Sequence, residues 1–195
     1  MSVLIMVVAG VLAGWAGRRL LGGLRRGAVV PAGWCEVGVS VAWGVIALRG
    51  MPWWWIAVPL LLAWGGVLLG VCDLRVHRLP DALTLPAYPV TAALLVLAAW
   101  HRPEVAVGSV AGLALFGGTY LLVRLVAPSA MGGGDVKLAG VLGAAVGAVS
   151  VPAVVGVVAA AAALTLLGAL SRPAGAVAHG PAMVVPSWLV TLFWP

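Results

Sequence analysis

Apolar residues run through this chain in long blocks, separated by short stretches that are polar or rich in glycine and proline. The blocks lack the alternation of apolar and polar positions that marks strands, so they predict helices rather than a barrel. Eight blocks can be delimited, and the last is short for a membrane crossing. They cover approximately residues 3–20, 35–48, 52–72, 82–100, 105–126, 135–149, 152–170 and 183–194. We therefore expect an all-α fold, a polytopic transmembrane helical bundle that forms a single domain over residues 1–195.

The composition supports a membrane protein and argues against a nucleic-acid-binding one. Of the 195 residues, 64% are hydrophobic and only 8% are charged, whereas a soluble domain carries about a quarter charged residues. The net charge is +6, but the arginines lie singly or in pairs at the ends of apolar blocks. That distribution is a topology signal rather than a phosphate-binding stripe. We expect membrane lipid, and no nucleic acid, as a partner.

The basic residues predict an orientation in the membrane. With the N-terminus outside, only Arg49 and Arg102 fall on the outer side, because the other nine basic residues fall in cytoplasmic loops. Those nine are Arg18, Arg19, Arg25, Arg26, Arg75, Arg78, Arg124, Lys137 and Arg172. Positive charge collects on the cytoplasmic side of membrane proteins. We expect a multi-pass protein of the cell inner membrane with both termini outside.

Two polar motifs interrupt the apolar pattern on the side predicted to be cytoplasmic. The stretch DLRVHRLPDALT begins at Asp73, and the stretch MGGGDVKL carries Asp135 and the only lysine, Lys137. A carboxylate at membrane depth is costly and is a functional-site hypothesis by default. Two carboxylates that come close share a proton, so that one activates water while the protonated one polarises a carbonyl. The pair Asp73 and Asp135 therefore predicts a hydrolytic site.

Simpler roles remain open for several residues near these motifs. Asp135 and Asp81 can cap the helices that they precede, and Lys137 can contact substrate or lipid phosphate or only follow the positive-inside rule. The three glycines, Gly132, Gly133 and Gly134, can form a tight turn or leave room for a substrate backbone beside the carboxylates. His179 is expected to be a solvated loop residue. Pro86 and Pro89 predict either a kink or an irregular first turn in block 82–100.

The two motifs together resemble those of the type IV prepilin peptidase and preflagellin peptidase family, the GxGD intramembrane aspartyl proteases. That family carries D-x-x-x-x-x-(I/L)-P-(D/N)-x-L-T and, two membrane segments later, GxGDxKL. The residues that match are Asp73, Leu79, Pro80, Asp81, Leu83 and Thr84 in the first motif and Gly132, Gly134, Asp135, Lys137 and Leu138 in the second. The stretch His179-Gly180-Pro181 is similar, less closely, to the family's Pro-Phe-Gly-Pro element. The resemblance covers about residues 65–188, the expected peptidase-like core.

The resemblance implies that Asp73 and Asp135 are the catalytic pair. The expected supporting or substrate-binding residues are Gly132, Gly133, Gly134, Lys137, Pro80 and Asp81. The implied substrates are pilin or pseudopilin precursors, in which a short basic leader precedes a hydrophobic helix and is cleaved at the cytoplasmic membrane boundary. Hydrolysis of this kind needs no cofactor and no metal. A further prediction is conformational gating, in which the flexible glycine turn holds the two carboxylates apart in the unliganded protein.

One departure from the family concerns the loop after the first block. Many bacterial members carry a cytoplasmic domain there with two CxxC pairs, associated with zinc and with methylation of the new N-terminus. Residues 21–34 form only a short basic loop without a CxxC pair, and Cys35 and Cys72 lie far apart. We therefore expect peptidase activity without methyltransferase activity.

Other functions are weighed against this one. A peptidase for pseudopilins or for signal-peptide remnants keeps the chemistry and changes the substrate. A small transporter would use Asp73 and Asp135 as proton or cation ligands, but transporters usually place such residues near the bilayer midplane. A scaffold without catalysis leaves the paired motifs unexplained. Replacing either aspartate by asparagine distinguishes a protease from a scaffold, because a protease loses its activity with either change and a scaffold is indifferent to it.

Overall fold

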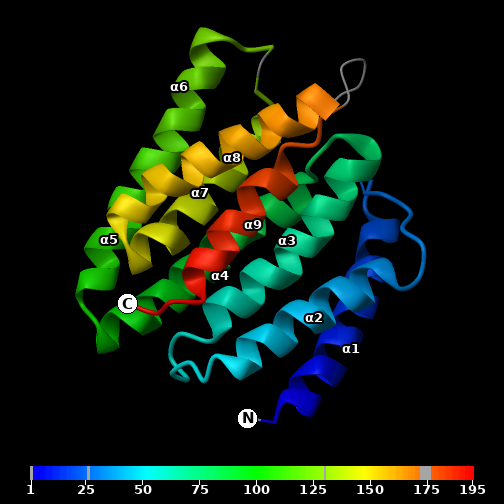
Figure 1. Cartoon of the computed structure of the whole chain (residues 1–195), viewed down its shortest axis with the longest axis vertical. Helices are drawn as coiled ribbons and strands as arrows, with labels where there is room; N and C mark the ends of the chain where they lie inside the picture. Colours follow the sequence, from blue (N-terminus) through cyan, green and yellow to red (C-terminus); the bar gives the residue numbers. More distant parts are fainter. Residues whose placement is uncertain (1, 26, 130, 172–176) are drawn as a thin grey trace.

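The computed structural model describes residues 2–25, 27–129, 131–171 and 177–195. Over these residues the chain is helical and forms eight rods that run alternately in opposite directions (Figure 1). One rod consists of α5, a π-helical turn η1 and α6, which follow one another without a break. The elements are α1 (Val3–Gly23), α2 (Trp34–Leu48), α3 (Ala57–Val76), α4 (Asp81–His101), α5 (Glu104–Gly112), η1 (Leu113–Gly117), α6 (Gly118–Val126), α7 (Gly133–Val149), α8 (Val151–Ser171) and α9 (Gly180–Thr191). The all-α prediction is confirmed.

Five of the rods are long and apolar enough to cross a membrane. They are α1, α3, α4, the continuous rod Glu104–Val126 and α8. The remaining helices α2, α7 and α9 have 15, 17 and 12 residues. At a rise of 1.5 Å per residue, a helix of about 20 residues is needed to span the hydrocarbon core. The chain is a multi-pass membrane protein, and its eighth segment is short, as the sequence predicts.

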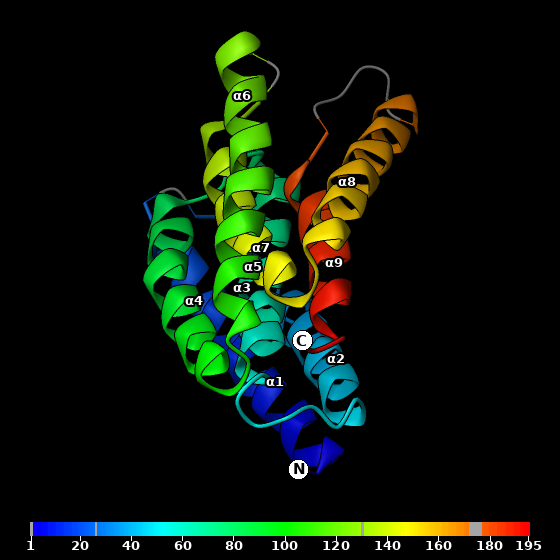
Figure 2. The ribbon, with the colours of Figure 1, turned by 90° about the vertical axis from the view of Figure 1, so that its left-hand side faces the viewer.

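Both chain termini lie at one end of the bundle, and the two polar motifs lie at the other (Figures 1 and 2). The helices α1, α3, α6 and α8 end at this second end, and α2, α4, α7 and α9 begin there. We call it the aspartate end, because α3 carries Asp73 in its last turn and α7 carries Asp135 in its first. Two motifs that are about 60 residues apart in sequence are thus brought to one level.

Helix α7 forms the centre of the core. Every residue from 138 to 148 is buried, and the helix packs against α4, α5, η1, α6, α8 and α9. Its approach to α5 is close because Gly143 and Gly147 lie against the backbone of Gly108 and Gly112, where a β-carbon on any of the four would collide with the facing helix. Small residues permit such contacts between membrane helices. The helix that carries Asp135 is therefore fixed in position along most of its length.

Two helices are longer than the sequence predicts. Helix α3 continues to Val76, beyond the predicted end at residue 72, and so contains Asp73. Helix α9 begins at Gly180, three residues before the predicted start, with Pro181 in its first turn, where no N–H is required. Helix α4 is continuous through Pro86 and Pro89. The prediction of an irregular first turn is therefore wrong.

Candidate active site

Asp73 is a buried carboxylate held by the N-terminus of another helix. Its side chain lies in the last turn of α3, and the residue is 6% exposed. The backbone N–H of Gly180, the first residue of α9, donates a hydrogen bond of 2.8 Å to Asp73 Oδ2. A helix N-terminus attracts a negative charge. A β-carbon on Gly180 would lie 3.1 Å from the same oxygen, so a glycine permits this approach.

Asp135 is half-buried and lies in the first turn of α7. The residue at the N-cap position is Gly132, and Asp135 is the third residue of the helix, so the structure does not support the simpler alternative in which Asp135 is the capping residue. A carboxylate in the first turn is still favoured by the helix dipole. The Asp135 carboxylate packs directly on the α-carbon of Gly132, where a β-carbon would lie 2.6 Å from Oδ2.

The two carboxylates lie near one another. They are close enough for the negative charge of Asp73 to act on Asp135 by like-charge repulsion. The charge of Asp73 also acts on His179, and the charge of Asp135 acts on Tyr120. Helices α3, α6 and α7 and the start of α9 therefore converge on one site.

The glycines of the second motif are required for space and not for unusual backbone angles. None of Gly132, Gly133 and Gly134 has a positive φ. A β-carbon on Gly132 would meet Asp135, and one on Gly134 would lie 2.8 Å from the β-carbon of Leu79, which belongs to the first motif. A β-carbon on Gly133 would meet nothing closer than 3.6 Å. The first and third glycines are therefore constrained by their neighbours, and the middle one is not.

Arg124 fixes the turn that precedes α7. Its Nη1 donates a hydrogen bond of 2.6 Å to the backbone oxygen of Met131. The guanidinium of this arginine also lies over Gly133, the first residue of α7. Because α6 ends two residues after Arg124, the contact joins the end of α6 to the turn that delivers Asp135. From its place in the sequence, Arg124 is expected only to follow the positive-inside rule.

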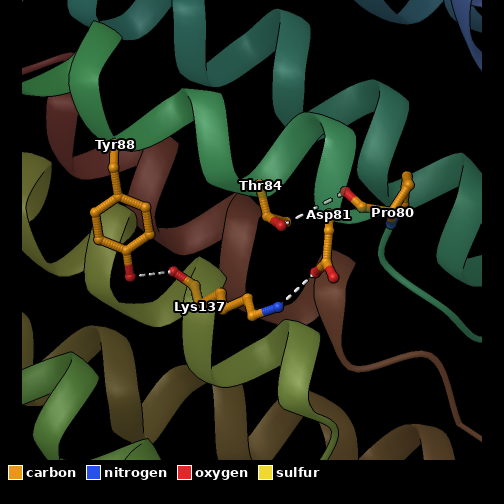
Figure 3. A network of polar contacts seen from close by, with 5 residues as sticks. All are labelled: Pro80, Asp81, Thr84, Tyr88 and Lys137. Atoms are coloured by element: carbon orange, nitrogen blue, oxygen red, sulfur yellow. Dashed lines mark hydrogen bonds and ion pairs between the residues drawn. The ribbon is translucent and has the colours of Figure 1, made fainter.

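An ion pair joins the two motifs directly. Lys137 Nζ lies 2.6 Å from Asp81 Oδ1, and the hydroxyl of Tyr88 donates a hydrogen bond of 2.7 Å to the backbone oxygen of Lys137 (Figure 3). The side chains of Lys137 and Asp81 are 39% and 43% exposed. Pro80 is the N-cap residue of α4, and its oxygen accepts a hydrogen bond of 3.5 Å from the Thr84 hydroxyl. Lys137 thus connects α7 to the start of α4. The sequence does not predict this contact.

Reversing the two charges of this pair tests whether the contact positions the site. We expect Asp81→Lys or Lys137→Asp alone to lower the leader cleavage that the motif resemblance implies by about tenfold, because like charges then face each other between α4 and α7. The double variant Asp81→Lys/Lys137→Asp restores the attraction and is expected to recover activity to within about threefold of wild type. Rates of leader removal in membranes, normalised to protein level, measure the effect. A double variant that is no better than the worse single variant would contradict this role.

His179 is enclosed in a hydrogen-bonded network and is not the solvated loop residue that the sequence predicts. Its Nε2 lies 2.8 Å from the Tyr120 hydroxyl, and its Nδ1 lies 2.6 Å from the Thr165 hydroxyl. Thr165 donates its own proton to the oxygen of Ala161, so Nδ1 must donate to Thr165 and Nε2 must accept from Tyr120. This network assigns the neutral form, with its proton on Nδ1. It ties α6 and α8 to the residue that precedes Gly180.

The neutral state of His179 leads to a prediction on pH. Burial lowers the pKa of His179 below its ordinary value, although the nearby negative charge of Asp73 acts in the opposite direction. A histidine takes up its proton near pH 6.5 in the unfolded chain and only at lower pH in this fold, so acid favours the unfolded state. We expect the thermal midpoint of the protein in detergent to decrease as the pH is lowered below about 6.5. In the variant His179→Gln we expect this decrease to be less steep. Parallel curves for the two proteins would contradict this.

Fold and site together define a multi-pass membrane protein that carries two neighbouring carboxylates at one end of a helical bundle. The model of the type IV leader peptidase family matches residues 60–170, more than half of the chain. The chain belongs to this family, and its kind of activity is that of a leader peptidase, a protease. The resemblance found in the motifs is thereby confirmed. The matched stretch includes both motifs and ends before His179. No curated protein and no solved structure matches the chain.

Proposed function

We propose that the protein is an aspartic endopeptidase of the inner membrane that removes the leader of type IV prepilin-like precursors. One observation carries this proposal: Asp73, which begins the first family motif, and Asp135, the aspartate of the second, lie near one another at one end of the bundle. The chemistry of a carboxylate pair is hydrolysis by an activated water. The family supplies the kind of substrate.

The contacts of the two carboxylates support different roles for them. Asp73 accepts the N–H of Gly180, so its Oδ2 lies beside the partial positive charge of a helix N-terminus. Asp73 therefore acts as the base that takes a proton from water. Asp135 carries the shared proton and donates it to the oxygen of the scissile carbonyl while hydroxide attacks the carbon. The tetrahedral intermediate then collapses, the C–N bond breaks, and the leaving amine takes up the proton.

The aspartate end is the cytoplasmic end in this proposal. Two of the described basic residues, Arg49 and Arg102, flank helices at the opposite end. The other described ones belong to the aspartate end, where the positive-inside rule places cytoplasmic loops; they are Arg18, Arg19, Arg25, Arg75, Arg78, Arg124 and Lys137. A precursor whose apolar helix lies in the bilayer presents its leader junction at this depth.

Methylation of the new N-terminus is not part of the proposed activity. The connection between α1 and α2 contains ten residues, from 24 to 33, and Arg26 within it lies outside the described residues. The two cysteines, Cys35 and Cys72, are both buried in helices and are distant in sequence. The loop therefore offers no counterpart to the CxxC-bearing domain of longer relatives.

Co-expression with candidate precursors tests the proposal. We expect at least one precursor with a basic leader and an apolar helix to lose its leader when the protein is present, with the mature mass detected by mass spectrometry. An empty vector and a precursor without the apolar helix are the controls. Failure to shorten any such precursor, with normal membrane levels of both proteins, would contradict it.

A further inference from the structure

An apolar groove lies between α3 and α4 and is open to the bilayer. Its cavity has a volume of about 270 Å³, and its lining is apolar except for the hydroxyl-bearing Thr91. Helices α7 and α9 contribute to its floor, and Leu20 of α1 lies at its edge. Leu20 and Val90 are exposed on its rim, and Gly65 leaves open space, since a β-carbon there would meet nothing within 4 Å.

The floor of this groove leads to the two aspartates. On α3, Leu62, Gly66 and Leu69 line the groove, and the next residue on the same helix face is Asp73, since positions spaced by three or four lie above one another. On α7, Leu142 and Leu138 line it, and the next position towards the helix start is Asp135. An object lying along the groove would therefore reach both carboxylates at its aspartate end.

The character of the surface changes from apolar to polar at the start of α4. A second cavity of about 380 Å³ lies there, lined by Leu24, Arg25, Pro80, Asp81 and Ala82. Ala82 lines both cavities, so the two adjoin. Three of the five acidic residues of the protein, Asp73, Asp81 and Asp135, gather at this end of the groove. The pair of cavities thus has a long apolar part and a short polar part, in which Asp81 and Arg25 both line the wall and Asp81 pairs with Lys137.

We propose that the precursor docks in this groove, with its apolar helix between α3 and α4 and its leader over the polar cavity at the start of α4. The inference rests on the proposed function and names where the substrate lies. An occupant within the hydrocarbon must satisfy its own backbone hydrogen bonds, which requires a helix. The open surface at Gly65 and the small Ala87 allow a helix to approach closely. The junction of helix and leader then comes to lie at the two aspartates.

A second apolar cavity beside α4 does not fit this role. It lies between α4, α5 and α7, has a volume of about 260 Å³ and is lined by residues that include Tyr88, Ala92 and Gly140. Its aspartate end is closed, because Tyr88 bonds the backbone of Lys137 and Lys137 pairs with Asp81. Of the two faces of α4, the one towards α3 leads to the catalytic residues.

Filling the groove tests the proposal. We expect Gly65→Leu to raise KM for the precursor by about tenfold and to leave kcat within about twofold, because uniform substrate binding is lost. Gly156→Leu is the matched control, since Gly156 on α8 also has nothing within 4 Å of a β-carbon and does not line the groove. Wild-type kinetics in Gly65→Leu would overturn the docking site. No cleavage by the wild type would instead overturn the proposed function, and the docking site with it.

Cross-linking distinguishes the possible occupants. We expect Gly65→Cys, combined with Asp73→Asn to prevent turnover, to form a disulfide with a single cysteine in the precursor helix when copper–phenanthroline is added. Gly156→Cys is expected to form none, and the native Cys35 and Cys72 are buried. A disulfide between two enzyme chains would identify a second copy as the occupant and overturn the proposal. The absence of any disulfide at Gly65→Cys would leave lipid as the occupant of the groove and would also overturn the proposal.

Discussion

Asparagine in place of Asp73 or Asp135 is expected to lower leader cleavage by about 1,000-fold or more, since each change removes one member of the proposed acid–base pair. Asparagine keeps the shape of the side chain but can neither take a proton from water nor give one to a carbonyl oxygen. In Asp73→Asn the remaining amide oxygen still accepts the Gly180 N–H, so the fold around α9 is preserved. The loss is therefore expected in kcat, with little change in KM.

Initial rates with a purified precursor measure this loss. Glu104→Gln is a suitable control, because Glu104 is an exposed carboxylate at the opposite end of the bundle, where it pairs with Arg102. We expect Glu104→Gln to cleave like the wild type. If either aspartate variant kept a tenth or more of the wild-type rate at equal membrane level, that aspartate would not belong to a catalytic pair.

The second large effect concerns the glycines before Asp135. We expect Gly132→Ala to lower activity by about 100-fold, because a displacement of about 1 Å at a catalytic group has a cost of this size. The added methyl group would lie only 2.6 Å from the Asp135 carboxylate oxygen, so the carboxylate would have to shift. Gly134→Ala is expected to lower activity by about tenfold or more, since its methyl group would press on Leu79 and displace the start of α7 from the first motif.

Gly133→Ala is the matched control within the same turn. Its methyl group would meet only the Arg124 guanidinium, at an ordinary contact distance of 3.6 Å, so activity is expected to stay within about twofold of wild type. Thermal midpoints of all three variants in detergent separate a local displacement from unfolding. Equal losses in the three variants would show that the turn needs glycine for its backbone freedom, and would contradict the account based on space.

Much of the fold follows from the apolar pattern. Lipid forces every crossing segment to satisfy its own backbone hydrogen bonds, so apolar length alone locates the helices. The limits are less predictable, because the last turn of α3 and the first of α9 contain polar residues or glycine whose partners lie on other helices. Asp73 is an example: its carboxylate accepts a hydrogen bond from the N–H of Gly180, 107 residues later in the chain.

The candidate site, too, could be predicted from the sequence only in part. The pair of Asp73 and Asp135 could be predicted, because charged residues are rare in this chain and each of the two lies in a polar motif. The contact between Asp81 and Lys137 could not, since 56 residues separate them and only the packing of α4 on α7 brings them together. The network of Tyr120, Thr165 and His179 depends on three elements. The signal for this network in the sequence is the hydroxyl group that Tyr120 and Thr165 each place within an apolar block.

The most direct test of the central claim is leader removal by the purified protein alone. Wild-type protein and one precursor are reconstituted together in lipid vesicles, and the intact masses of the products are measured. We predict two fragments that divide the precursor where its polar leader meets its apolar helix, and no fragments with Asp73→Asn or Asp135→Asn. An intact precursor in the wild-type vesicles, or equal fragments in all three, would contradict a peptidase built on these two aspartates.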